Sequence, residues 1–241
     1  METAHDRRPD DFTQTRWSMV QRLGAPQSGE AHQALTELAL RYWYPVYAYV
    51  RRCGHAPEIA QDITRAFFQR MAIEAGEPGG LPHGRFRDWL LTRLNVFLAG
   101  DWHELTECET QAGSPPLDDL ERRHRGDQAI GDSPAQAFQR GYALEVLARG
   151  FKALQVEAGQ TGHLDMYEML EPYLARDPLP GQYEEMGRHL GVRPVALVLA
   201  LKRLRQRFRE LVREELADAV ASPEDLAAEQ QALFAALARG G

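Results

Sequence analysis

The stretch Tyr183–Leu204, YEEMGRHLGVRPVALVLALKRL, has the residue spacing of a helix-turn-helix. Counted from Tyr183 as position one, apolar residues fall at positions four, eight, ten, fifteen and eighteen, which are Met186, Leu190, Val192, Leu197 and Ala200. Gly187 stands where the two helices must cross closely, and Gly191 stands where the turn needs a positive φ. The short first helix, the glycine turn and the apolar period therefore predict a helix-turn-helix.

The second helix of this motif runs into an arginine-rich segment, KRLRQRFRELVR. Residues 183–213 hold eight Lys or Arg and three Asp or Glu, although the whole chain has a formal charge of −7. A basic surface on an acidic protein favours a localised contact with phosphates. The side chains that we expect to meet DNA here are Arg193, Lys202, Arg203 and Arg205.

Two alternatives to DNA contact remain open for this helix. Its arginines could simply cover a solvated surface. In addition, Val195, Val198 and Leu199 lie where a recognition helix usually carries polar side chains. Base readout would then be apolar and weak, or another part of the protein would cover the helix.

Serine-proline pairs mark two further helix starts. Ser133-Pro134 and Ser222-Pro223 each offer an N-cap followed by a favourable first helical residue. The helices expected in the C-terminal half span residues 134–157, 161–175, 182–190, 193–216 and 223–238. The last one has an apolar stripe of Leu226, Leu233, Phe234 and Leu237. It should pack on a domain of the same chain, or else lie over the DNA-binding surface.

The N-terminal half also has helical spacing. Helices are expected from Phe12 to Leu23, over Ala31–Gly54, from about Pro57 to Met71 and over Arg85–Trp102, with a loop at 74–84. Pro45 should kink or interrupt the second of these. Its aromatic residues are too numerous for one buried stripe, so most should be core and one or two should face a partner; they are Tyr42, Trp43, Tyr44, Tyr47 and Tyr49. Because strand signals are poor, the chain is expected to be all-α.

Several functional classes find little support. Cys53 and Cys108 form no CxxC pair, so neither a disulfide framework nor a zinc site is expected. No apolar run is long enough to span a membrane, and the polar N-terminus has no signal-peptide core, which favours a reduced, cytoplasmic protein. The histidines lack metal-ligand spacing, and the catalytic motifs HExxH and G-x-S-x-G are absent. We expect no enzyme and no cofactor.

Taken in order, the motifs of the chain resemble the extracytoplasmic-function sigma factors of bacterial RNA polymerase. TRWSMV, RYWYPVYAYVRR, APEIAQDITRAFFQRM and GRFRDWLLTRLNVFLAGDW look like region 2 of one branch of the family, and Tyr183–Glu215 looks like region 4. The resemblance implies two helical domains joined by a flexible linker. The expected divisions are an extension (1–29), a region 2-like domain (30–104), a linker (105–132), a region 4-like domain (133–218) and a helical tail (219–241).

The resemblance also implies a function, that of an alternative sigma factor directing promoter-specific transcription initiation. Region 2 would hold the clamp of core RNA polymerase and open the −10 element of promoter DNA. Region 4 would bind the −35 element and the polymerase flap. Residues matching the segment that meets the −10 strand are Arg87, Trp89, Arg93 and Asn95. Cationic and aromatic side chains suit single-stranded bases, although Trp89 could equally be a core residue.

The helix that begins at Pro57 departs from the family pattern. Family members often carry several carboxylates in a stretch like PEDAEDLTQEFF, where this chain has PEIAQDITRAFF. Helical spacing places Ile59, Ala60, Ile63, Phe67 and Met71 on the expected core face. The opposite arc is the expected polymerase-binding surface and comprises Gln61, Asp62, Thr64, Arg65 and Phe68.

This under-charged helix suggests a phosphorylation hypothesis. A phosphate on Thr64 would add about −1.5 to −2 charge, which would replace the missing carboxylates, and a Ser/Thr protein kinase would then be a partner. Alternatively, Thr64 is an ordinary flanking residue and the helix docks differently. Two functions from other classes remain open as well, a dimeric helix-turn-helix regulator and an interaction module that does not act as a sigma subunit.

Overall fold

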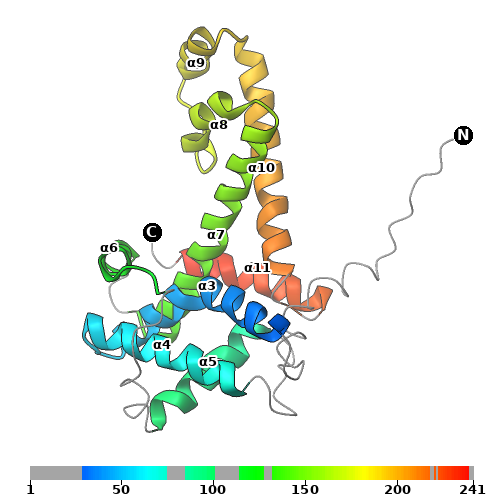
Figure 1. The fold of residues 1–241 in the computed structure, drawn as a ribbon. Coiled ribbons are helices and arrows are strands. Elements are labelled where there is room, and N and C mark those ends of the chain that lie inside the picture. Colours follow the sequence, from blue (N-terminus) through cyan, green and yellow to red (C-terminus); the bar gives the residue numbers. More distant parts are fainter. Residues whose placement is uncertain are drawn as a thin grey trace, which may run out of the picture. The chain divides into compact units, whose positions relative to one another are not determined.

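The computed structural model describes residues 29–74, 85–100, 114–127, 132–217, 220 and 222–238. These residues form helices and connections with no strand among them, so the all-α prediction is confirmed (Figure 1). The chain divides into two compact units, Met1–Glu145 with Leu216–Gly241, and Val146–Glu215. The predicted helix at Phe12–Leu23, most of the loop at 74–84 and Cys108 lie outside the described residues.

The first unit is built around helix α3. Its helices are α3 (Gly29–Arg52), α4 (Pro57–Glu74), α5 (Phe86–Ala99), α6 (Leu117–Asp127), the first part of α7 (Pro134–Gln160) and α11 (Pro223–Ala238). Helix α3 packs against both α4 and α6. Helix α7 crosses α3 where a Cβ on Gly141 would lie 3.2 Å from the Cα of Pro45. Pro45 lies within α3 and does not interrupt it.

The aromatic residues of α3 are all buried. These are Tyr42, Trp43, Tyr44, Tyr47 and Tyr49. Tyr42 lies with its ring centroid 5.2 Å from that of Phe86 on α5 and 5.4 Å from that of Tyr142 on α7. The expectation that one or two of the aromatics face a partner is therefore wrong. Helices lie on several sides of α3, so more than one stripe of its surface is core.

The segment expected to be a flexible linker contains helix α6. Leu120 and His124, four residues apart, are both buried. Glu121 accepts a hydrogen bond from Tyr47 Oη at 2.5 Å and forms an ion pair with Arg51 Nε at 2.7 Å. The prediction of a flexible linker is therefore wrong for this segment, because Leu120 and His124 of α6 are buried and Glu121 pairs with Arg51 of α3.

The units also differ from the expected domains. Their boundary falls at Glu145 and Val146, inside α7, and not near residue 133. Helix α11 belongs to the first unit, which supports packing of the tail on a domain of the same chain. Leu226 and Leu233 of its stripe are buried, whereas Phe234 is exposed.

The second unit holds the rest of α7, α8 (Leu164–Leu170), the short 3₁₀ helix η2 (Glu171–Tyr173), α9 (Gln182–Leu190) and most of α10 (Pro194–Ala217). One core cluster joins α8, α9 and α10 through Leu170, Met186, Leu197 and Leu201. Helices α7 and α10 approach closely where a Cβ on Gly150 would lie 3.0 Å from the Phe208 ring. The helix predicted at 161–175 is shorter than expected.

Both predicted N-caps are confirmed. Ser133 Oγ accepts the backbone N–H of Gln136 at 3.3 Å, and the Gln136 side chain accepts the backbone N–H of Ser133 at 2.8 Å. This reciprocal pair is a capping box. Ser222 Oγ likewise accepts the backbone N–H of Asp225 at 3.1 Å. The prolines that follow the two serines are the first residues of α7 and α11.

Candidate nucleic-acid interface

The turn between α9 and α10 has the geometry that its glycines predicted. Gly191 has φ 66°, a left-handed conformation that a residue with a Cβ rarely adopts. A Cβ on Gly187 would lie only 2.7 Å from the carbonyl oxygen of Val192. The Val192 N–H donates to the Gly187 carbonyl at 2.9 Å, which closes the turn before α10 begins at Pro194. The chain therefore contains a helix-turn-helix.

The apolar positions of the motif lie as the spacing predicted. Met186 and Leu197 are buried. The other three, Leu190, Val192 and Ala200, are partly buried and pack against the same cluster. Because α9 and α10 share this core with α8, the exposed side of α10 is held in a defined orientation within its unit.

The exposed side of α10 carries both apolar and cationic residues. Val195 is 69% exposed, Val198 45% and Leu199 51%. Arg193, Lys202 and Arg203, three of the predicted DNA contacts, are also exposed. Within its unit this surface can offer cations to phosphates, while its central residues can offer bases only apolar contacts.

Arg205 was predicted to contact DNA, and in the structure its guanidinium is engaged within its own unit. Its guanidinium donates to Asp177 Oδ1 at 2.7 Å and to the backbone carbonyls of Tyr173 and Arg176 at 2.8 and 2.7 Å. These bonds attach the segment after η2 to α10. A run of arginines in the sequence does not reveal which of them point toward a loop of the same chain.

Arg207 is a second arginine of α10 that is engaged within its unit. It lies 2.6 Å from Glu157 and 3.2 Å from Glu214, and its Nη1 reaches Glu210 at 3.4 Å. The hydrogen bond from Arg207 lowers the pKa of Glu157, so that carboxylate stays charged. The cations available to a nucleic acid on α10 are therefore fewer than the sequence suggests.

Arg87 on α5 was also predicted to meet DNA, and it is buried instead. Its Nε lies 2.7 and 2.9 Å from the two carboxylate oxygens of Glu229 on α11, which is buried as well. The guanidinium also lies over the ring of Tyr142, 5.7 Å from its centroid. Burial raises the pKa of Glu229 while Arg87 opposes that rise. Arg87 therefore joins α5 to α11.

The remaining predicted −10 residues are partly accessible. Trp89 is half-buried with its ring centroid 5.3 Å from that of Phe86. The guanidinium of Arg93 lies 5.6 Å from the centre of the Trp89 ring, so these two side chains form a cation–π pair. Asn95 is exposed and accepts a hydrogen bond from Tyr49 at 2.5 Å. The structure thus brings Trp89 and Arg93 together.

The faces of α4 are only partly those predicted, since Ala60, Ile63, Phe67 and Met71 are buried as expected. Thr64 and Phe68, expected to be exposed, are buried, whereas Ile59, expected to be core, is 44% exposed. The Thr64 hydroxyl donates to the Ala60 carbonyl at 2.7 Å. Phe68 stacks on Trp43 with 5.6 Å between ring centroids. The Thr64 hydroxyl is inaccessible in this fold, which contradicts the phosphorylation hypothesis.

The polar residues predicted to bind polymerase contact the chain itself. Gln61 Nε2 donates to the Pro115 carbonyl at 2.8 Å, and Arg65 Nε donates to Ser114 Oγ at 3.3 Å. Arg65 also pairs with Asp62 at 2.7 Å. Gln61 and Arg65 thereby hold the segment that enters α6, and an ionised carboxylate at position 61 could not donate to the Pro115 carbonyl.

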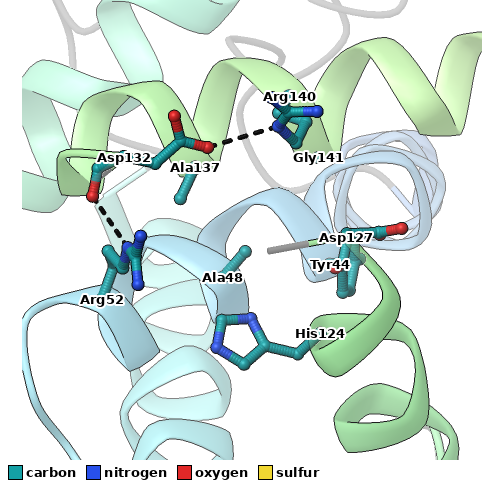
Figure 2. A pocket seen from close by; sticks show the side chains of 9 residues that line it. All are labelled: Tyr44, Ala48, Arg52, His124, Asp127, Asp132, Ala137, Arg140 and Gly141. Atoms are coloured by element: carbon teal, nitrogen blue, oxygen red, sulfur yellow. Dashed lines mark hydrogen bonds and ion pairs between the residues drawn. The ribbon is translucent and has the colours of Figure 1, made fainter. Parts of the chain in front are cut away.

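A small polar pocket lies where α3, α6 and α7 meet (Figure 2). The Asp132 backbone carbonyl accepts from Arg52 Nε at 2.7 Å, and its carboxylate lies 3.2 Å from Arg140 Nε. Burial and the nearby Arg51 lower the pKa of His124 in its wall. With a volume of about 10 Å³, the pocket has room for about one water and does not suit a ligand.

No described helix is long and apolar enough to cross a membrane. No group of His, Cys, Asp or Glu that could hold a metal ion occurs in the part of the chain that the structure describes.

No family model, curated protein or solved structure matches this chain.

Proposed function

We propose that the chain is an alternative sigma-type subunit of bacterial RNA polymerase that directs promoter-specific transcription initiation. The observation that carries the proposal is the helix-turn-helix, in which Gly187 and Gly191 fix the turn and leave α10 with exposed cations. The order of region 2-like and region 4-like motifs along the chain supports the sigma class over other helix-turn-helix proteins.

The second unit would bind the −35 duplex. Arg193, Lys202 and Arg203 would contact phosphates, which fix the orientation of a protein on DNA without reading its sequence. The exposed Val195 and Val198 would meet thymine methyl groups, the apolar feature of the major groove. We therefore expect modest sequence discrimination at the −35 element and a steep dependence of binding on salt.

The first unit would act on the −10 element and on polymerase. The Trp89–Arg93 pair offers an aromatic face beside a cation, the combination that binds unstacked bases. On α4 the accessible residues that would face the polymerase clamp include Glu58, Ile59 and Asp62, which lie at three- and four-residue spacing. Glu58 and Ile59 are exposed and Asp62 is half-buried.

In vitro transcription with core polymerase tests the proposal. The full chain, without any kinase, is incubated with core enzyme and a library of promoter fragments, and run-off transcripts are sequenced. Transcripts sharing upstream elements, together with copurification of the chain with core enzyme, are expected. Lys202→Gln should reduce initiation at every promoter similarly, because a phosphate contact carries no sequence information. The control is Arg122→Gln on the exposed side of α6.

The exposed apolar residues of α10 favour one other candidate, an interaction module that binds protein rather than DNA. The same experiment separates the two. If the chain neither copurifies with core enzyme nor yields specific transcripts, the sigma proposal is wrong. Binding to DNA alone, without polymerase, would indicate an operator-binding regulator.

A further inference from the structure

The second unit contains a pocket of about 430 Å³ between the C-terminal turns of α7, helix α8 and helix α10. Its volume lies in the range of about 300–1,000 Å³ that is usual for small-molecule sites. Its apolar walls are formed by Leu154, Ala158, Met166, Tyr167, Ala200 and Leu204. The sequence carries no local signal for this pocket, because its residues come from three separate segments.

The floor of the pocket offers no unsatisfied hydroxyl. Leu154, Ala158 and Tyr167 are buried members of one apolar cluster. The Tyr167 hydroxyl donates to the Phe151 carbonyl at 3.3 Å. Thr161 donates to the backbone carbonyls of Glu157 and Ala158 at 2.9 and 3.2 Å. A molecule that fills the floor must therefore present an apolar body to it.

The rim of the pocket carries charges of both signs. Its charged residues are Glu157, Arg203 and Arg207. Arg207 donates from Nε and Nη2 to Glu157 and from Nη1 to two further carboxylates, so four of its five N–H groups are engaged. Arg203 makes no hydrogen bond or ion pair with any residue that the structure describes, and it is exposed. The residues lining the pocket therefore leave one positive charge unmatched.

We infer that this pocket binds a small amphipathic monoanion. Its apolar body packs on the floor between α7 and α8, and its carboxylate or similar group accepts hydrogen bonds from Arg203. One unmatched guanidinium suits a single negative charge, and the apolar floor selects against a fully polar anion such as phosphate.

The ligand would share Arg203 with the proposed DNA surface. Ala196, Ala200 and Arg203 lie on the second helix of the helix-turn-helix and also line the pocket. A guanidinium that holds a carboxylate is not available to a DNA phosphate, so ligand and DNA should compete. This consequence rests on the proposed function, whereas ligand binding itself does not.

Calorimetric titration of octanoate into the full chain tests the inference, with octylamine as the matched cation. Saturable binding of one octanoate per chain is expected, and octylamine should bind far more weakly. Arg203→Gln should weaken octanoate binding by about ten-fold or more, as expected for loss of a charge-assisted hydrogen bond. Arg213→Gln, an exposed arginine of α10 outside the pocket, is the control and should bind normally.

A second variant blocks the pocket without altering charge. Ala196→Phe at the exposed mouth should abolish octanoate binding, whereas Val195→Phe, outside the pocket lining, should preserve it. Circular dichroism confirms that both variants remain helical. Absence of saturable octanoate binding, equal binding of octylamine, or equal effects of Arg203→Gln and Arg213→Gln would each overturn the inference. Because the titration contains neither DNA nor polymerase, its failure leaves the proposed function standing.

Discussion

Helices α4 and α10 both carry apolar residues outside the face that helical spacing assigns to the core. These residues are buried on α4 and exposed on α10. On α4, Phe68 is buried against Trp43. On α10, Val195 and Leu199 are exposed. Helix α4 has core contacts on two sides, since Phe67 also packs with Phe97 of α5 at 5.5 Å between ring centroids. Exposure of an apolar residue is thus decided by the number of neighbouring elements as well as by helical period.

The largest effect that this difference predicts is on stability. Phe68→Ala should lower the free energy of unfolding by about 3–5 kcal/mol, because it leaves a cavity beside Trp43. Leu199→Ala on α10 should change it by less than about 0.5 kcal/mol, as expected for an exposed residue. Urea denaturation followed by circular dichroism measures both. Similar losses from the two variants would show that α10 is covered.

A smaller loss of stability is predicted for a substitution at Thr64 on α4. Thr64→Glu should destabilise the protein by at least about 2 kcal/mol, because a buried unpaired polar group costs about 1–3 kcal/mol and a charge costs more. Thr64→Ser keeps the hydroxyl that donates to Ala60 and is the control. A Thr64→Glu variant as stable as the wild type would place residue 64 at the surface and revive the phosphorylation hypothesis. Thermal unfolding of the three proteins provides the measurement.

Gly191→Ala, in the turn before α10, should lower the free energy of unfolding by about 1–2 kcal/mol. Gly191→Ala forces a side chain into a left-handed conformation at φ 66°. Gly159→Ala on α7 is the control, since a Cβ there meets nothing within 4 Å and lies in a helix that favours alanine. Equal stabilities for the two variants, measured by urea midpoint, would mean that the turn is not held in the described conformation.

The smallest predicted effects are on the free energy of unfolding and its dependence on pH, at one ion pair in each unit. The hydrogen bond from Arg51 lowers the pKa of Glu121, so this carboxylate contributes stability above its unfolded pKa of about 4.3 and loses it as pH falls through the lower folded value. Glu121→Gln should therefore lower the free energy of unfolding by about 1 kcal/mol at pH 7 and by progressively less below pH 4. Urea midpoints across this range measure it.

Glu157→Gln in the second unit should show the same pH trend with a smaller loss. Glu157 and Arg207 are more exposed than Glu121 and Arg51, and solvent screens exposed pairs. If Glu157→Gln lowered the free energy of unfolding more than Glu121→Gln does, the expectation that the more exposed ion pair contributes less would be contradicted.

The helix-turn-helix and the serine caps were predictable because each depends on residues close together in the sequence. Gly191 needs its φ for a local turn, and Ser222 Oγ accepts a hydrogen bond from the backbone N–H of Asp225, three residues along the chain. The faces of α4 were not predictable, because they depend on α5 and on Ser114 and Pro115 at a distance of about fifty residues. The roles of Arg87 and Arg205 were missed for the same reason, since their partners lie far along the chain.

The pairing of Arg87 with Glu229, 142 residues apart, has a consequence for synthesis on the ribosome. The second unit is one continuous stretch and can fold as soon as it has emerged. The first unit needs α11, which is translated after the whole second unit, to neutralise the guanidinium of Arg87. Nascent chains that stop before α11 thus lack the counter-charge of Arg87, and they should be substrates for chaperones and proteases until the last helix arrives.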